Sequence, residues 1–161
     1  MNHTDHNPQR SRRDVLIDGA RLAGGVGLLL AAVPAARATP ESMLSAMKKV
    51  VGEASLRKGR VKLELPPLIE NGNSVQMTVT VDSPMTPVDY VKGIYVFNEK
   101  NPQPNVINIH LGPRAGRANI QTRIRLADSQ RVIAVAEMND GTFWSDEIEV
   151  IVTLAACLEV L

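Results

Sequence analysis

The sequence is short of cysteine: Cys157 is the only one among 161 residues, and four residues follow it. A single cysteine cannot close a disulfide within the chain, so its thiol is free, modified or bonded to another molecule. Two interpretations stay open on these grounds. Cys157 is either a small apolar side chain buried near the end of a strand, or a reactive thiol on a terminal segment that can reach outward.

Aromatic residues and net charge are scarce as well. The five aromatic residues make up 3% of the chain, so a core must consist mainly of Val, Ile, Leu and Met. The formal net charge of +1 provides no strong field to attract nucleic acid or an anionic membrane surface. The sequence therefore predicts no nucleic-acid partner.

Motifs for metal, nucleotide and hydrolytic chemistry are missing too. Beyond residue 38 the only histidine is His110, and no cluster with ligand spacing, glycine-rich phosphate loop or Gly-x-Ser-x-Gly motif occurs. His110 is a conceivable base for Cys157, but its place on the polar face of a predicted strand favours a solvated or interface histidine. We therefore predict no catalytic residue, no metal site and no cofactor.

A group of arginines in the second half of the chain could bind an anion, although a solvated sheet face is the favoured interpretation. The group consists of Arg114, Arg117, Arg123, Arg125 and Arg131.

Residues 1–38 have the features of an export signal. A twin arginine, Arg12-Arg13, precedes a weakly apolar region at residues 22–36, and Ala36-Arg37-Ala38 has the small-x-small pattern of a cleavage site. The apolar run is too short for a spanning helix, so we predict no membrane anchor. We expect export to the periplasm by the twin-arginine route, with a mature chain of residues 39–161. That compartment is oxidising, which favours chemistry at an unpaired thiol.

The mature chain begins with a predicted helix and continues with predicted strands. Thr39-Pro40-Glu41 has the pattern of a helix start, apolar residues follow at helical spacing, and Gly52 can end the helix. Alternating apolar and polar residues then predict seven strands. They lie at residues 60–65, 75–81, 91–98, 106–111, 118–126, 131–138 and 143–154.

Two strands carry further detail. Residues 131–138 are almost continuously apolar, which predicts a central strand, and Asn139-Asp140-Gly141 predicts a hairpin turn after it. In the last strand, Ile148, Val150, Val152 and Leu154 are expected to face inward. Seven closely spaced strands without intervening helices predict an all-β fold, an immunoglobulin-like β-sandwich with a short N-terminal helix.

Several stretches together resemble the SoxY family, the sulfur-carrier subunit of the periplasmic thiosulfate-oxidising (Sox) system. The similarity runs through residues 89–97, 99–102, 116–118, 122–126, 135–141 and 152–153, and it ends at Cys157. It implies a sandwich domain over residues 39–161 that pairs with a SoxZ-like subunit as a heterodimer and meets the Sox pathway enzymes transiently. It also implies that Cys157 is the covalent attachment site for sulfur and that the protein is not itself an enzyme.

The terminus departs from the family pattern, which usually ends Gly-Gly-Cys-Gly-Gly. Here Ala155 and Ala156 precede Cys157, and residues 158–161 (Leu-Glu-Val-Leu) follow it. These residues restrict the backbone more than glycine does. If the alternation of the last strand runs to the end of the chain, Cys157 and Glu159 share a face and the carboxylate disfavours a thiolate; a short helical turn is the alternative for residues 154–161. Two hypotheses therefore stay open: a covalent sulfur carrier with a bulkier arm, or a SoxY-like binding or assembly subunit that has lost efficient carrier chemistry.

Overall fold

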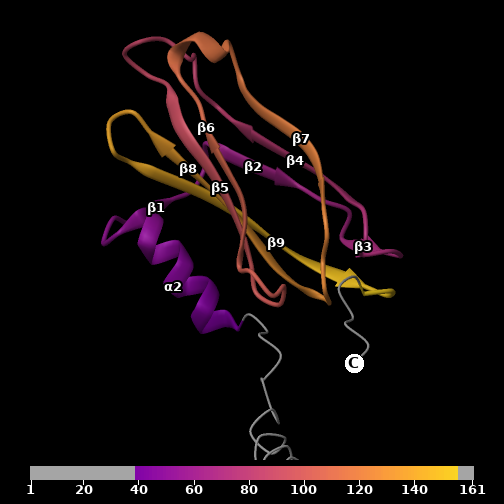
Figure 1. Ribbon diagram of the computed structural model, residues 1–161. Coiled ribbons are helices and arrows are strands. Elements are labelled where there is room, and N and C mark those ends of the chain that lie inside the picture. The colour runs from indigo at the N-terminus through magenta and orange to yellow at the C-terminus, as the bar shows by residue number, and fades with distance from the viewer. Residues whose placement is uncertain (1–38, 156–161) are drawn as a thin grey trace, which may run out of the picture. The chain divides into compact units, whose positions relative to one another are not determined.

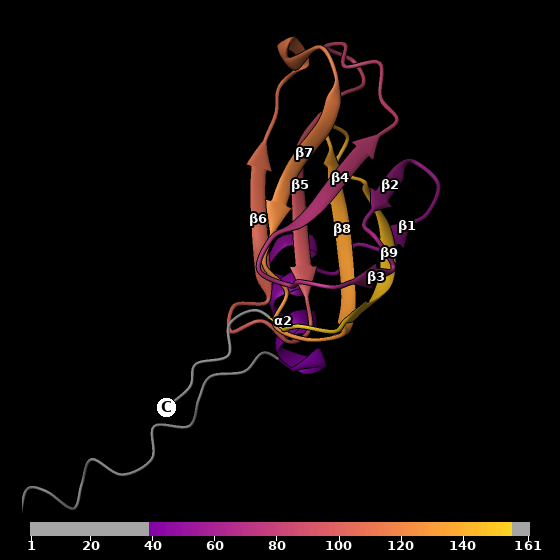
Figure 2. The same cartoon turned by 90° about the vertical axis from the view of Figure 1, so that its right-hand side faces the viewer.

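The computed structural model describes residues 39–155. Its strands form two sheets that pack face to face, and one helix covers the outer face of the larger sheet, as Figures 1 and 2 show from two directions. The predicted all-β sandwich with a short N-terminal helix is confirmed; the finer label immunoglobulin-like stays a prediction. No helix in residues 39–155 has the length and apolar character to cross a membrane.

Helix α2 (Pro40–Val51) begins and ends where the sequence predicts. The Thr39 side chain accepts a hydrogen bond from the Ser42 amide, and the Ser42 hydroxyl interacts with the Thr39 backbone, which forms a capping box. Gly52 ends the helix with φ 64°, a conformation that side chains rarely adopt, and its amide donates to the Lys48 carbonyl.

The larger sheet has the strand order β1-β9-β8-β5-β6, and β3 also pairs with β9. Strand β8, predicted to be central, lies between β9 and β5 and pairs antiparallel with both. The Met138 amide donates to the Thr142 carbonyl at 2.9 Å, which closes the predicted hairpin between β8 and β9. The strands are β1 (Leu56–Arg57), β3 (Leu68–Ile69), β5 (Val91–Asn98), β6 (Asn105–His110), β8 (Gln130–Met138) and β9 (Phe143–Val152).

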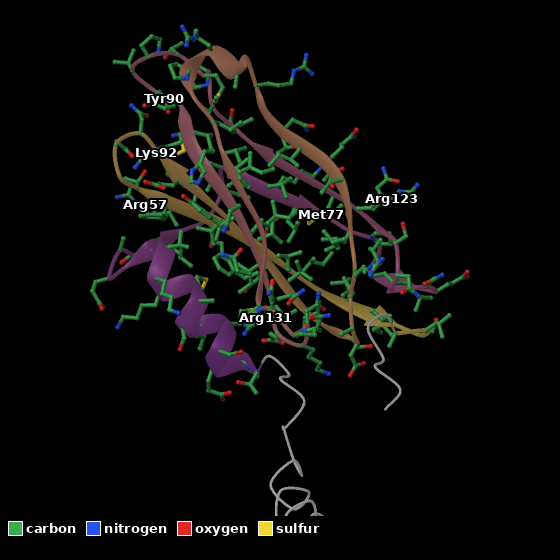
Figure 3. The ribbon with its side chains drawn as sticks, viewed as in Figure 1. Arg57, Met77, Tyr90, Lys92, Arg123 and Arg131 are labelled. Atoms are coloured by element: carbon green, nitrogen blue, oxygen red, sulfur yellow. The ribbon has the colours of Figure 1, made fainter. Side chains whose placement is uncertain are left out.

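The smaller sheet has the order β2-β4-β7, all antiparallel. Its strands are β2 (Val61–Glu64), β4 (Val75–Val81) and β7 (Ala118–Ile124), and a short 3-10 helix, η2 (Pro113–Ala115), precedes β7. Alternate residues of β4 are buried, so that Met77 lies fully buried between the sheets (Figure 3). This alternation is the physical reason that the sequence pattern located the strand.

Strand β5 contributes to two hydrophobic clusters because both of its faces are covered. Ile94 and Val96 face the smaller sheet and belong to the main core, whereas Tyr95 and Phe97 face α2. This division follows from the alternation of side chains along a strand.

Three details of the prediction were wrong. Residues 39–155 form nine strands instead of the predicted seven, because β1 and β3 are two-residue strands that pair in parallel with β9 and show no periodicity. Strand β9 ends at Val152 rather than at residue 154. Leu154 is 56% exposed instead of facing inward, because residues 153 and 154 bend away from the strand direction.

Candidate functional site

Cys157, the predicted sulfur-attachment residue, lies outside the described residues 39–155. The part of its surroundings that the structure describes is the end of β9, where the chain leads toward it. We therefore build the site from the groups that hold residues 151–154 in place.

Strand β3 holds one side of this end. Leu68 pairs with Ile151 and Ile69 with Val152 in a parallel register. The pairing continues past the strand, since the Thr153 amide donates to the Ile69 carbonyl at 2.9 Å and the Thr153 hydroxyl contacts the same oxygen at 3.3 Å. Figure 1 shows β3 beside the C-terminal end of β9.

Gly72 anchors the last described turn of the chain. Its amide donates to the Leu154 carbonyl at 2.8 Å, and its own carbonyl accepts from the Leu126 amide at 2.9 Å. Gly72 is buried, so both backbone hydrogen bonds are shielded from water. The chain is thus fixed up to Leu154, three residues before Cys157.

Ser129 holds the other side of the strand end. Its hydroxyl oxygen accepts a hydrogen bond from the Val152 amide at 2.9 Å. Strand β8 begins only at Gln130, so its backbone does not reach the Val152 amide. A buried polar pair supports this segment. Gln130 Nε2 donates to Asn101 Oδ1 and to the Asp128 carbonyl, and Asn101 Oδ1 also accepts from the Ala127 amide.

The surface at this end is apolar. Leu68 is 59% and Ile151 is 61% exposed, and they lie side by side because they are register partners. Leu154 follows with 56% of its surface exposed. Sequence reasoning missed this feature, although one signal was present: Ile151 occupies a position where the alternation of β9 calls for a polar residue.

His110 does not lie near the end of β9, so it is not placed to act as a base there. It is exposed at the end of β6, the far edge of the larger sheet, where its ring meets Tyr95 edge-on at 6.0 Å. Strand β6 is separated from β9 by β5 and β8. This placement agrees with the solvated or interface histidine that the sequence favoured.

Tyr95 also belongs to a small polar network with Glu137 and Lys92. Its hydroxyl donates to Glu137 Oε2 at 3.0 Å, and Lys92 Nζ donates to Glu137 Oε1 at 2.6 Å. Burial, together with the hydrogen bond and the negative charge of Glu137, raises the pKa of Tyr95 to about 12. The hydrogen bond and the charge of Glu137 likewise raise the pKa of the exposed Lys92. Glu137 holds the Tyr95 hydroxyl and the Lys92 ammonium together, so we assign the network a structural role.

The predicted arginine group does not form one surface. Arg131 lies on β8 of the larger sheet and forms an ion pair with Glu99 at 2.8 Å, whereas Arg123 lies on β7 of the smaller sheet and donates to Ser74. Figure 3 shows the two arginines on different elements. Arg114 and Arg117 are exposed around η2. The favoured interpretation, a solvated sheet face, fits Arg123 alone; Arg114, Arg117 and Arg125 are exposed outside the strands, and Arg131 is paired with a carboxylate.

A second cluster surrounds Trp144 at the other end of β9. The guanidinium groups of Arg57 and Arg60 lie 5.8 and 5.7 Å from the centre of its ring. Hydrogen bonds from Thr142 lower the pKa of Asp140, and the charges of Arg57 and Arg60 lower it further. Within residues 39–155, no group of three or more His, Cys, Asp or Glu side chains could hold a metal ion.

Solved structures with this arrangement of strands include a sulfur carrier and superoxide reductases. The sulfur carrier protein SoxY from Chlorobium limicola f thiosulfatophilum superposes with a TM-score of 0.60 at 22% identity, over 72% of this chain and 100% of that chain. The superoxide reductase (neelaredoxin) from Ignicoccus hospitalis gives a TM-score of 0.52 at 18% identity, over 71% and 94% of the two chains. At these identities the similarities show the fold alone. The fold thus defines a class of protein: a β-sandwich in which the single cysteine of the sequence follows strand β9.

The sequence comparison identifies the family. The family model "Sulfur oxidation protein SoxY" matches residues 47–157, so the chain belongs to the SoxY family. The match ends on Cys157 and includes the whole of the anchored end of β9. No curated protein sequence matches the chain.

Proposed function

We propose that this protein is a covalent sulfur carrier of thiosulfate oxidation and that Cys157 is the attachment site. One observation carries the proposal: the SoxY family match spans residues 47–157, and its last position is the only cysteine of the chain. The structure adds support, because hydrogen bonds with β3, Ser129 and Gly72 hold the chain up to Leu154. The thiol thus follows a fixed platform at a short distance in sequence.

The carrier role requires that Cys157 form and break bonds to sulfur. Joining thiosulfate to the thiol forms one S–S bond and releases a proton and two electrons: R–SH + S₂O₃²⁻ → R–S–S–SO₃⁻ + H⁺ + 2e⁻. The electrons pass to a periplasmic electron-transfer protein, and other enzymes remove sulfur in later steps. The carrier contributes the thiolate, which is the nucleophilic form, and it presents the product to each enzyme in turn.

The localisation and the partner of the protein follow from its family and from the features of residues 1–38. The protein is exported by the twin-arginine route to the periplasm, pairs there with a SoxZ-like subunit, and performs no catalysis of its own. The features at residues 1–38 support export, since they contain the Arg12-Arg13 pair and the Ala36-Arg37-Ala38 pattern.

Intact-mass spectrometry of the exported protein tests the proposal. The full chain is expressed in a thiosulfate-oxidising bacterium, grown with or without thiosulfate, and purified under conditions that preserve thiol adducts. We expect sulfur-containing mass additions only in cells given thiosulfate, and none in a Cys157→Ser variant. An unmodified wild-type protein under both conditions would overturn the carrier role. It would favour the alternative, a binding or assembly subunit without carrier chemistry.

A further inference from the structure

The length of chain beyond Leu154 limits how far a partner can stay from the sandwich. Cys157 follows the anchored Leu154 by three residues. An extended chain spans at most about 3.3–3.6 Å per residue, so the Cys157 Cα stays within about 11 Å of the Leu154 Cα. An enzyme that reacts with sulfur on this thiol must therefore approach the end of β9.

The surface at that place has an apolar centre. Leu68 and Ile151 lie side by side on β3 and β9, and Leu154 follows beyond them, with 59%, 61% and 56% of their surfaces exposed. The described residues 39–155 expose five large hydrophobic side chains, and these three belong to the two adjoining segments. Scattered single apolar residues need no explanation, whereas a group at one place marks an interaction site.

The fold gives no reason for this group to be apolar. On β9 the positions 147, 149 and 151 share a face, and the first two are exposed glutamates. A polar residue at 151 would continue that pattern. Helix α2 covers part of the same face, but the cluster that it forms contains neither Leu68 nor Ile151.

Carboxylates flank the apolar group. Glu149 lies two positions before Ile151 on β9 and shares its face, and Glu70 directly follows β3, two positions after Leu68. Both are exposed, and neither forms an ion pair with any residue that the structure describes. A partner with basic groups around an apolar centre would complement this surface.

We propose that Leu68, Ile151 and Leu154 form the docking surface for the enzymes that load and unload Cys157. This inference rests on the proposed carrier function. The enzyme presents an apolar rim with basic residues around the mouth of its active site. When the enzyme docks on Leu68, Ile151 and Leu154, the Cys157 thiol is held near the enzyme's active site. This raises the effective concentration of the bound sulfur at the reacting group of the enzyme.

Paired substitutions on this surface test the inference. Leu68→Ser and Ile151→Ser are combined in the full chain, and Val88→Ser serves as the control, since Val88 is 86% exposed and lies in the loop between β4 and β5. All three side chains are exposed, so thermal unfolding should change little. Each purified protein is mixed with thiosulfate and the periplasmic fraction of a thiosulfate-oxidising bacterium, and adduct formation on Cys157 is followed by intact mass over a range of carrier concentrations.

We expect the apparent KM for the carrier to rise about five- to ten-fold in the double variant, with a limiting rate close to that of wild type. Val88→Ser should behave as wild type. Tetrathionate provides the reference reaction, because the thiolate displaces thiosulfate from it directly: R–S⁻ + S₄O₆²⁻ → R–S–S–SO₃⁻ + S₂O₃²⁻. This rate should be equal in all variants, since no enzyme takes part.

Other outcomes distinguish between different binding partners of this surface. Equal enzymatic kinetics in wild type and the double variant would overturn the docking surface and leave the carrier function intact. Loss of a co-purifying subunit, or a change of oligomeric mass, with unchanged kinetics would show that the surface binds a subunit or a second copy instead. If no protein acquires an adduct, wild type included, the carrier function fails and this inference fails with it.

Discussion

The amide of Gly72 donates a hydrogen bond to the carbonyl of Leu154 at 2.8 Å, which ties the turn before β4 to the chain just beyond β9. Gly72 also accepts from the Leu126 amide at 2.9 Å, at the end of the smaller sheet. One buried residue therefore connects the smaller sheet to the point from which Cys157 follows. A carrier benefits from this arrangement, because a fixed starting point limits the volume in which the thiol is found.

Removing the Ser129 hydroxyl should weaken the anchored end of β9. The Ser129→Ala substitution leaves the buried Val152 amide without its hydrogen-bond acceptor, which costs about 1–3 kcal/mol of the free energy of unfolding. Denaturant unfolding measures this loss. Ser74→Ala is the matched control, because the Ser74 hydroxyl is exposed and contacts only the exposed Arg123, and it should change stability by less than about 0.5 kcal/mol. Equal effects of the two substitutions would contradict the anchoring role of Ser129.

Replacing the terminal residues with glycine should speed the exchange of sulfur with partner enzymes. Residues 158–161 are Leu-Glu-Val-Leu, whose side chains restrict the backbone more than glycine would. A variant with four glycines in their place should give a higher rate of enzymatic adduct formation, measured by intact mass in the periplasmic mixture. An unchanged rate would mean that the bulk of the tail is not limiting.

Gly93 should tolerate no side chain. A Cβ atom at this position would lie 2.7 Å from Tyr95 Oη and 2.9 Å from its ring, and Tyr95 is held by its hydrogen bond to Glu137. We expect Gly93→Ala to displace the ring and to lower the free energy of unfolding by about 1–3 kcal/mol. Gly112→Ala is the control, since nothing lies within 4 Å of its Cβ position. A Gly93→Ala protein as stable as Gly112→Ala would show that the Tyr95 ring moves at no cost.

Tyr95 should make stability fall at high pH. Burial and Glu137 raise its pKa to about 12 in the folded protein, above the ordinary value of about 10. The folded state therefore binds more protons than the unfolded state between these values, so the contribution is fully present below pH 10 and is lost as the pH rises toward 12. Ultraviolet titration should show a phenolate that forms only near pH 12 and is missing in Tyr95→Phe. Complete ionisation of both tyrosines of the folded protein near pH 10 would contradict this account.

The regular parts of the fold were predictable because each carries a periodic signal. The helix cap at Thr39, the alternation of β4 and the two faces of β5 all follow from local sequence. Strands β1 and β3 were not predictable, since two residues cannot show a period and their pairing with β9 is set by tertiary contacts. The outward turn of Leu154 depends on Gly72, a partner more than eighty residues away in sequence.

The candidate site was predictable only in part. The isolation of Cys157 and the resemblance to the SoxY family predict it as the attachment residue; the family match ends on it, and its role stays a prediction. The apolar surface at the end of β9 was not predictable, because Leu68 follows two prolines and proline is unfavourable within a strand. Its exposure depends on the parallel pairing of β3 with β9, which brings Leu68 beside Ile151.

A pulse and chase with sulfur-labelled thiosulfate tests the carrier role most directly, because it separates a turning-over carrier from a thiol that is modified once. Cells that express the full chain receive labelled thiosulfate and then an excess of unlabelled thiosulfate, and the peptide that contains Cys157 is analysed at intervals. We predict that the label enters this peptide during the pulse and leaves it during the chase. A label that never reaches Cys157, or that stays on it throughout the chase, would contradict the account.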